Sequence, residues 1–442
     1  MATGREIFVE DRIIQLLKHL KIERAHFASS GLPDWRGLAA NYPEAILSLA
    51  LVCPWGFDPV TAKALSSRLL VIKGDKGPMA EQAENALKNI PEAKQFTLRD
   101  YAGLAWDDIA VDKTDDIGSA ILEFLSSSDS KLKTESMNLP EGKGEVDGIS
   151  YHIQGSGPPL VLLPLMSPSQ WKPVLSLLSQ EYCTITLGGA FLGSAAVLET
   201  RSKTPGYLRV VQRVINELAL NPEDKILDIG CGTGFFGRWL ARGEYGLKQI
   251  TGLELNPYLL GEAQSLVDHE GLGNIITLKE GNAESLPFDE NSFSVTTALT
   301  VLEETNADSS LAEMFRVTEL GGQVAVIVRA QDLPLRVNIT LHPELKKKIE
   351  IPFGAGVAAN GCADASLYQK FRQVGLSEVK ILPDAIIFAN PQGTMERALL
   401  GTILGTLNPE EQGVCRDVIE KAAFDGTFFL MQPVHCATGR KH

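Results

Sequence analysis

The sequence has few cysteines and histidines, and neither type shows the spacing of a metal site or a disulfide framework. The six cysteines in 442 residues include no C-x-x-C pair and no regular series. The seven histidines include no H-E-x-x-H or comparable ligand pattern. We therefore expect reduced thiols in a reducing compartment and no bound metal.

Long apolar runs are also absent. The longest one near the start of the chain, residues 45–53, is far too short to span a bilayer. Residues 1–25 lack the pattern of a secretory signal. We expect a soluble cytoplasmic protein without a membrane partner.

Clustered positive charge is the third absence, in a chain whose formal net charge is −14. The only short basic run, residues 346–348, fits a solvated helix face. Because nucleic-acid binding draws on clustered Lys and Arg, we expect no nucleic-acid partner. The chain is 44% hydrophobic and long enough for two or three domains.

A glycine-rich stretch, residues 226–237 (ILDIGCGTGFFG), is the most informative part of the sequence. Apolar residues, an acid and then repeated glycines predict a buried strand that turns tightly into a helix. Glycine has no Cβ, so the backbone of such a turn can approach a ligand closely. The helix that follows directs its free amide groups and the positive end of its dipole toward the turn. We expect a nucleotide site here.

Two cofactors fit this stretch. Gly232, Gly234 and Gly237 satisfy the dinucleotide pattern G-x-G-x-x-G, so a dinucleotide-dependent oxidoreductase is one alternative. Asp228 favours another ligand, because a pyrophosphate site normally avoids a carboxylate at this position. S-adenosylmethionine (SAM) has an ammonium group and no phosphate. Residues 228–234 (D-x-G-x-G-x-G) resemble the first motif of the class I SAM-dependent methyltransferases.

The resemblance continues along the chain and implies the roles of further residues. Glu254, at the tip of the expected second strand, corresponds to the acid that accepts the ribose hydroxyls. The segment 280–298 (EGNAESLPFDENSFSVTTA) resembles the adenine-binding motif, with Asn282 where Asp is common. Tyr207, on an expected helix over residues 205–219, is a further possible contact. The cofactor residues implied are Asp228, Gly230, Cys231, Gly232, Gly234, Glu254, Leu255, Asn256, Asn282, Ala283 and Leu299.

The acceptor pocket is expected after the fifth strand, where residues 330–360 are rich in Pro, Leu and Gly. We also expect a helix at 364–374 and strands at 379–382 and 428–434, the last one antiparallel. A catalytic base is needed only if the acceptor must lose a proton. No catalytic residue is identified; the candidates for a base are Glu303, Glu304, His342, Asp364 and His435.

The first part of the chain alternates between expected strands and helices, which predicts a parallel sheet covered on both faces. The phrases IERAHF, NYPEAILSLALVCP, LLVIKGDKGP, IPEAKQF and IGSAILEFL resemble the second half of the α/β-hydrolase family, in that family's order. Residues 146–189 resemble its opening half. The resemblance implies a circularly permuted hydrolase whose old ends are joined by a polar linker, residues 126–145.

The hydrolase resemblance does not extend to a complete catalytic triad. Ser30 falls on the nucleophile position, but Ala28 and Leu32 replace the glycines of the elbow. The place of the acid falls on Gly77 and that of the histidine on Leu104. Without an imidazole the serine has no general base, so we expect a degenerate domain.

The sequence thus predicts an α/β protein with two domains, a hydrolase-like sheet in residues 1–190 and a Rossmann-like methyltransferase sheet in residues 191–442. We expect methyl transfer from SAM to a small-molecule acceptor, with the first domain as scaffold or lid. A bifunctional hydrolase and methyltransferase, or a SAM-binding protein without transfer activity, are the alternatives. A homo-oligomer is possible.

Overall fold

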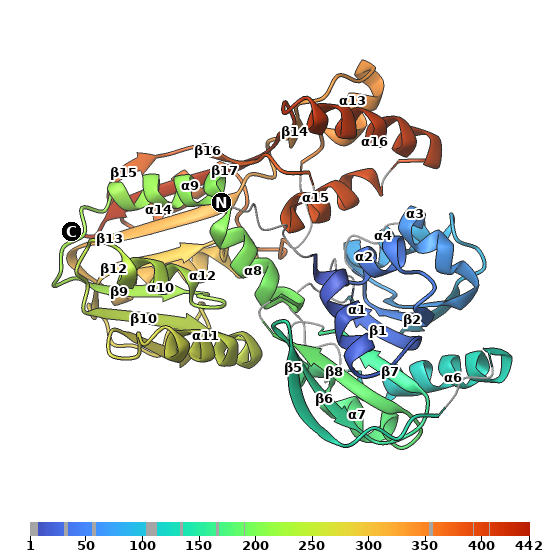
Figure 1. Cartoon of the computed structure of the whole chain (residues 1–442). Helices are drawn as coiled ribbons and strands as arrows, with labels where there is room; N and C mark the ends of the chain where they lie inside the picture. The colour runs from blue at the N-terminus through green and yellow to red at the C-terminus, as the bar shows by residue number, and fades with distance from the viewer. Residues whose placement is uncertain are drawn as a thin grey trace, which may run out of the picture. The chain divides into compact units, whose positions relative to one another are not determined.

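The chain folds into two compact units, each built around its own sheet (Figure 1). The computed structural model describes residues 8–442 except 31–33, 55–58, 103–112, 133–135, 165–167, 190, 353–356, 392 and 406. The first unit comprises Met1–Val197 and Arg397–Gly413, and the second comprises Leu198–Glu396 and Val414–His442. Among the described helices, none is both long and apolar enough to cross a membrane.

In the described part of the first unit, eight strands form one sheet in the order β4-β3-β2-β1-β7-β8-β6-β5. Strand β6 is antiparallel to both β5 and β8, and the other neighbours are parallel. The strands are β1 (Ala25–Ser30), β2 (Ile46–Val52), β3 (Leu69–Gly74), β4 (Lys94–Leu98), β5 (Gly142–Val146), β6 (Ile149–Gln154), β7 (Pro159–Leu162) and β8 (Cys183–Gly188).

Helices cover both faces of this sheet, as the alternation of elements predicted. One apolar cluster joins α1 and α2 to the sheet, and a second joins α6 and α7 to it. The helices are α1 (Val9–His19), α2 (Asp34–Asn41), α3 (Pro59–Ala62), α4 (Gly77–Leu87), α6 (Thr114–Leu132), α7 (Lys172–Leu178) and α8 (Gly193–Lys203), with 3-10 turns at Lys63–Arg68 and Pro168–Trp171.

Much of the segment expected as a polar linker, residues 126–145, has regular structure. Helix α6 continues to Leu132, and within it the hydroxyls of Ser127 and Ser128 donate to the carbonyl of Phe124. Strand β5 then pairs with β6 across a two-residue loop. Both loop residues, Asp147 and Gly148, have positive φ angles, as a tight hairpin turn requires.

The boundary between the units also differs from the expected one at residues 190 and 191. It lies inside α8, and Arg397–Gly413 belongs to the first unit. The carboxylate of Glu10 is 2% exposed and requires a cationic partner, which Arg397 supplies at 3.6 Å. This long-range ion pair attaches part of α15 (Thr394–Leu404) to the first unit.

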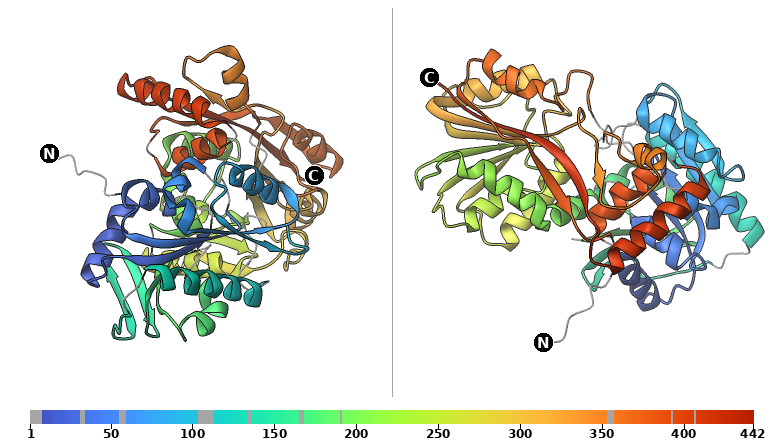
Figure 2. Two further views of the ribbon diagram at one scale, coloured as in Figure 1. Left: turned by 90° about the vertical axis from the view of Figure 1, so that its right-hand side faces the viewer. Right: turned by 90° about the horizontal axis from the view of Figure 1, so that it is seen from above.

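The second unit has a larger sheet whose described strands follow the order β11-β10-β9-β12-β13-β17-β14, with β15 and β16 also paired to β17. Strand β17 runs antiparallel to β13, as expected for the last strand, although it is longer than predicted (Figure 2). The strands are β9 (Lys225–Ile229), β10 (Gln249–Glu254), β11 (Ile276–Glu280), β12 (Phe293–Leu299), β13 (Thr318–Arg329), β14 (Arg336–Val337), β15 (Ser377–Ile381), β16 (Asp384–Phe388) and β17 (Leu430–Arg440).

The strands from β11 to β13 are parallel, so their carboxyl ends meet at one edge of the sheet. An apolar core packs α12 and α14 against one face. Helix α9 packs closely on β16, where a Cβ on Gly206 would lie 2.2 Å from the carbonyl oxygen of Ile387. The helices are α9 (Pro205–Asn216), α10 (Phe235–Arg242), α11 (Pro257–His269), α12 (Ala307–Val317), α13 (Pro343–Ile349) and α14 (Ser366–Gln373). Helix α16 (Pro409–Phe424) begins in the first unit and belongs to the second from Val414 onward.

Candidate functional site

The glycine-rich turn lies at the carboxyl end of β9 and leads directly into α10, as the sequence predicted. Gly230, Gly232 and Gly234 have φ angles of 63°, 56° and 71°. Glycine adopts this left-handed conformation without steric cost. A Cβ on Gly230 would also lie 2.5 Å from a methyl carbon of Val301. The turn therefore requires glycine for its own backbone.

Cys231 connects the turn to the neighbouring strand β10. Its amide donates to the carbonyl of Leu253 at 3.0 Å, and its carbonyl accepts from the amide of Gly234 at 2.8 Å. A Cβ on Gly252 would lie 2.9 Å from its sulfur atom. Burial raises the pKa of the thiol well above its ordinary value. Cys231 thus acts as a small packing residue that fixes the turn.

Asp228 is a buried acid beside this turn, with a relative exposure of 2%. Among the described residues, only Thr297 donates a side-chain hydrogen bond to it, at 3.3 Å. Burial raises the pKa of its carboxyl to about 8, and the negative charge of Glu254 adds to the increase. The ionised form of this carboxylate therefore lacks a cationic partner from the described protein.

Glu254 ends β10 and bridges two backbone segments. Its Oε2 accepts from the amide of Gly232 at 2.8 Å, and its Oε1 accepts from the amide of Asn256 at 2.9 Å. Burial raises the pKa of the Glu254 carboxyl, although the amide hydrogen bonds oppose the increase. Each oxygen keeps a further lone pair. Asn256 caps α11 through its side chain, and Leu255 is 61% exposed.

Asn282 lies after β11 and is exposed, whereas Ala283 is buried. The side-chain oxygen of Asn282 accepts from the amide of Glu284 at 2.8 Å, so only one of its lone pairs remains for a ligand. The local turn that this hydrogen bond forms places the amide group of Asn282 at the surface. This arrangement differs from a side chain that is wholly available to an adenine ring.

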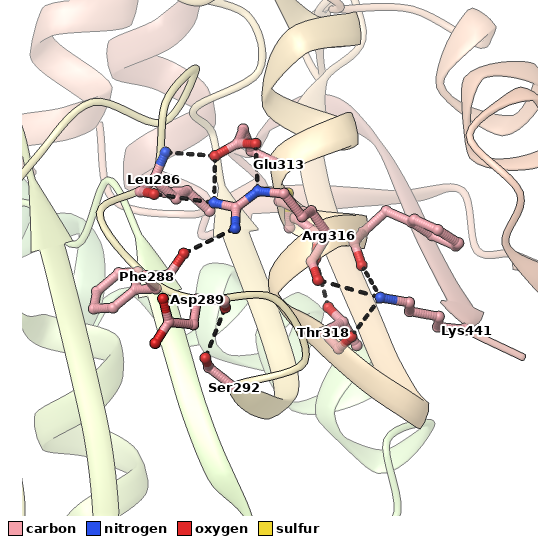
Figure 3. Close-up of polar contacts among 10 residues, drawn as sticks. Leu286, Phe288, Asp289, Ser292, Glu313, Arg316, Thr318 and Lys441 are labelled. Carbon is pink, nitrogen blue, oxygen red and sulfur yellow. Dashed lines mark hydrogen bonds and ion pairs between the residues drawn. The ribbon is translucent and has the colours of Figure 1, made fainter.

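A clamp from α12 fixes the loop that follows Asn282 (Figure 3). Glu313 accepts from the amide of Leu286 at 2.7 Å. Arg316 donates to the carbonyls of Leu286 and Phe288 at 3.0 and 2.8 Å, and it also pairs with Glu313 at 2.7 Å. Glu313 and Arg316 were not predicted from the sequence, because neither belongs to the adenine-binding motif itself.

Lys441, near the end of the chain, ties the last strand to the carboxyl end of α12 (Figure 3). Its ammonium group donates to the carbonyls of Phe315 and Thr318, each at 2.8 Å, and to the side chain of Asn291 at 2.9 Å. Only 8% of the residue is exposed, and burial lowers the pKa of its amine. Lys441 thereby satisfies helix carbonyls that have no intrahelical partner.

The carboxyl end of β12 has a strained backbone. Leu299 is partly buried, and Thr300 follows it with a φ angle of 60°, which is unfavourable for a residue with a branched side chain. Its hydroxyl accepts from Arg201 at 3.3 Å, and the Arg201 guanidinium lies 5.0 Å from the ring centre of Tyr207. Tyr207 is 2% exposed, and burial raises the pKa of its phenol.

Glu303 lies in the loop after β12 and is fully buried. Its Oε1 accepts from the backbone amide and the Nε of Arg329, at 2.8 and 3.3 Å. Its Oε2 has no hydrogen-bond partner within the described residues. Burial raises the pKa of the Glu303 carboxyl. Glu304 is exposed and lies 3.6 Å from Arg329. The Oε2 of Glu303 is therefore a buried acceptor without a hydrogen-bond partner among the described residues.

His435, on β17, forms the centre of a chain of three polar side chains. Its Nδ1 lies 2.9 Å from the hydroxyl of Tyr368, and its Nε2 lies 2.8 Å from the carboxylate of Asp332. Tyr368 and Asp332 were not among the residues predicted from the sequence. Of the other candidates, Asp364 is exposed and accepts from the amide of Ser366 at the start of α14. His342 is exposed at the start of α13, and no described hydrogen bond connects its side chain to the turn.

A buried network of ion pairs is hydrogen-bonded to the glycine-rich turn. Arg238, in α10, is 2% exposed and pairs with both Glu199 and Glu270. Glu199 also accepts from the hydroxyl of Thr233 at 2.6 Å. The network therefore orients the turn between Gly232 and Gly234. No sequence motif pointed to Glu199, because it lies in α8, far from the turn along the chain.

The candidate residues of the first unit are only partly described. The side chain of Ser30, residues 31–33 and Leu104 lie outside the described residues. Gly77 begins α4 with a φ angle of 81°. The nearby Asp75 is exposed and accepts from the amides of Asp100 and Tyr101 at 2.9 and 3.0 Å, and these hydrogen bonds lower the pKa of its carboxyl.

Comparison with known proteins agrees with the geometry of the second unit. Residues 227–326 match the family model described as "Methyltransferase domain". The chain is 34% identical over 114 residues to the ubiquinone/menaquinone biosynthesis C-methyltransferase UbiE of Allorhizobium ampelinum. This alignment covers 25% of this chain and 44% of that protein. It is 33% identical over 131 residues to the uncharacterized methyltransferase YodH of Bacillus subtilis, and this alignment covers 30% of this chain and 54% of that protein.

The alignments thus span about half the length of these curated relatives. Among solved structures, the YcgJ protein of Bacillus subtilis is 18% identical with a TM-score of 0.37, over 53% of this chain and 99% of that one. The chain carries a class I SAM-dependent methyltransferase domain, and SAM is the cofactor of this domain. The sequence-based predictions of a methyltransferase and of its cofactor are confirmed.

Proposed function

We propose that the chain transfers a methyl group from SAM to a small-molecule acceptor, with the cofactor at the glycine-rich turn. Asp228 is the observation that carries the proposal. Its carboxyl is buried beside three left-handed glycines, and its pKa is raised to about 8. An ammonium group would favour the ionised carboxylate and so offset the cost of its burial. The residues present therefore fit SAM.

The remaining contacts to the cofactor are assigned to hydrogen-bond donors and acceptors that the protein itself does not fully use. The free lone pairs of Glu254 accept the ribose hydroxyls, and the exposed side chain of Leu255 packs on the adenine. The first amides of α10 bind the carboxylate of the amino acid part. Asn282 contributes its second lone pair to the adenine amino group, and the Glu313 and Arg316 clamp fixes the loop that follows Asn282.

When bound, SAM supplies an activated methyl group on sulfur, so the protein has mainly to align the acceptor and exclude water. Glu303 is placed for alignment, because its unpartnered Oε2 can accept from a hydroxyl or amine of the acceptor. Tyr207 and Arg201 line the same edge of the sheet. A small-molecule acceptor is supported by the name of the UbiE relative, which refers to quinone biosynthesis.

We infer that the first unit is a circularly permuted α/β-hydrolase-like domain that serves as scaffold or lid. The strand order supports this inference. Counted from β5 through β8 and then from β1 to β4, the sheet has the order 1-2-4-3-5-6-7-8 with the second strand antiparallel. The order becomes regular only when the chain is renumbered in this way. Asp75 already binds two backbone amides, which supports a domain without an active acid.

Isothermal titration calorimetry with SAM and with NAD tests the proposed site, and mass spectrometry of cell extracts incubated with methyl-labelled SAM tests the transfer. We expect SAM binding, no NAD binding and a labelled metabolite. Glu254→Ala should weaken SAM binding, and Glu223→Gln, an exposed acid before β9, serves as the control. SAM binding without any labelled product would contradict methyl transfer and favour a SAM-binding protein. Binding of NAD alone would contradict the site assignment itself.

A further inference from the structure

Three hydrogen-bonded side chains, those of Asp332, His435 and Tyr368, lie at the same edge of the sheet as the glycine-rich turn. His435 pairs with Val328, the last residue but one of β13, and Asp332 follows the end of that strand. Tyr368 lies in the first turn of α14. We propose that these three side chains form a proton relay that removes a proton from a hydroxyl-bearing acceptor during methyl transfer. The inference rests on the proposed function.

Backbone contacts connect the relay to the loop where the acceptor is expected. The amide of Gln331 donates to the carbonyl of Ala363 at 2.6 Å, and the amide of Cys362 donates to the carbonyl of Leu302 at 2.8 Å. The segment before α14 is therefore fixed between the loop after β13 and the loop that contains Glu303. Tyr368 is partly buried and Asp332 is exposed, but Asp332 already accepts from His435 and from the amide of Ala365, so the relay meets its ligand through the hydroxyl of Tyr368.

The charge on Asp332 sets the direction of the relay. Burial opposes ionisation of this carboxyl, but hydrogen bonds from His435 and from the amide of Ala365 lower its pKa overall. The ionised Asp332 accepts, so Nε2 of His435 carries the ring proton and Nδ1 is left as an acceptor. Tyr368 must then donate to Nδ1 and keeps its oxygen lone pairs for the acceptor.

This arrangement follows the logic of the Ser-His-Asp triad, with a phenol in place of the serine hydroxyl. Burial raises the pKa of Tyr368 to about 12, so the phenol is neutral before the reaction and can pass its proton on. A permanently ionised tyrosine would need no relay. The edge-to-face contact of the two rings, at 86° and 5.4 Å between centres, fixes the orientation of both.

The acceptor hydroxyl gives its proton to the oxygen of Tyr368 while the proton of Tyr368 moves to Nδ1 of His435. The electron pair released on the acceptor, at oxygen or at a conjugated ring carbon, forms the bond to the methyl carbon. The bond between this carbon and sulfur breaks, and its electron pair stays on sulfur. The imidazolium is stabilised by Asp332 and loses its proton to solvent after turnover.

A tautomer measurement tests the relay without any acceptor. NMR of the full chain labelled with ¹⁵N-histidine, with the His435 signals assigned by His435→Gln, should show the proton on Nε2. Tyr368→Phe should shift only the Nδ1 signal, and Asp332→Ala should distribute the proton over both nitrogens. A proton on Nδ1 in the wild type would overturn the proposal.

A kinetic measurement tests the same variants with 1,4-naphthohydroquinone as the probe and methyl-labelled SAM. Tyr368→Phe and His435→Gln should lower kcat at least about 100-fold, which is typical for loss of general base catalysis, with the SAM Kd changed less than about twofold. His269→Gln, an exposed histidine of α11, is the matched control. Unchanged kcat in both variants would overturn the relay, and absence of SAM binding in the wild type would contradict the proposed function instead. If the wild type binds SAM but leaves the probe unmethylated, the tautomer of His435 measured by NMR decides whether the relay is retained or rejected.

Discussion

The two units each have an acid beside the carboxyl end of a parallel strand, but the surroundings of the two acids differ. Asp75, in the first unit, is exposed, and two backbone amides lower its pKa. Asp228, in the second unit, is buried with one side-chain donor among the described residues, and its pKa is raised to about 8. The first carboxylate is satisfied by its own loop, whereas the ionised form of the second has no amide or cationic partner among the described residues.

Two buried histidines show the same contrast. His26, on β1, is fully buried and lies 2.7 Å from the hydroxyl of Ser48 on the neighbouring strand. His435, in the middle of β17, lies between a carboxylate and a phenol and pairs with Val328 near the carboxyl end of β13. A histidine bonded to a hydroxyl within a sheet stabilises packing. A histidine between two titratable groups at the ligand edge can in addition move a proton.

The largest expected effect comes from removing the charge of Asp228. Asp228→Asn should weaken SAM binding by at least about 100-fold, because the ammonium group would lose its charged partner in a buried site. Isothermal titration calorimetry measures the change. Asp75→Asn is the matched control in the first unit and should leave the SAM Kd within about twofold. Similar losses in both variants would contradict the comparison between the units.

The pH dependence of SAM binding should follow the raised pKa of Asp228. Below about pH 8 the free protein holds this carboxyl mostly protonated, and binding of an ammonium requires its ionised form. Affinity should therefore increase about tenfold between pH 6 and pH 7, with release of a proton. Calorimetry in buffers of different ionisation enthalpy measures that proton. Asp228→Asn should bind SAM weakly and without this slope; a slope retained in the variant would assign the proton to another group.

Stability should depend on Lys441, which satisfies carbonyls at the end of α12. Lys441→Met keeps the apolar stem but removes the donors, so we expect a loss of about 1–3 kcal/mol in the free energy of unfolding. Urea denaturation of the full chain measures this loss. Lys347→Met, an exposed lysine on α13, should change the same quantity by less than about 0.5 kcal/mol. Equal effects would show that the buried hydrogen bonds contribute nothing specific.

The smallest effect is expected in the first unit. Ser30→Ala should leave the cleavage of p-nitrophenyl acetate unchanged, because the position of the triad histidine falls on Leu104. The measurement compares the rate of cleavage with the wild type and with the variant to the rate in buffer alone. Clear cleavage by the wild type that disappears in the variant would make the chain bifunctional and remove the contrast between the units.

The sequence by itself determined the features that depend on neighbouring residues. Residues 226–237 combine a buried strand, left-handed glycines and a helix start, so the strand, turn and helix formed as predicted. The alternation of elements likewise predicted an α/β protein with two sheets. The structure of residues 126–145 was harder to predict, because composition alone does not distinguish polar residues that continue a helix from a linker.

Only the tertiary structure decided which distant side chains meet. His435 lies 67 residues from Tyr368 and 103 residues from Asp332, and Glu10 finds its partner Arg397 near the other end of the chain. The clamp of Glu313 and Arg316 also depends on α12 packing beside a loop from another part of the sheet. Such pairings leave no periodic pattern in the sequence, because they arise from the order of the strands and the burial of charge.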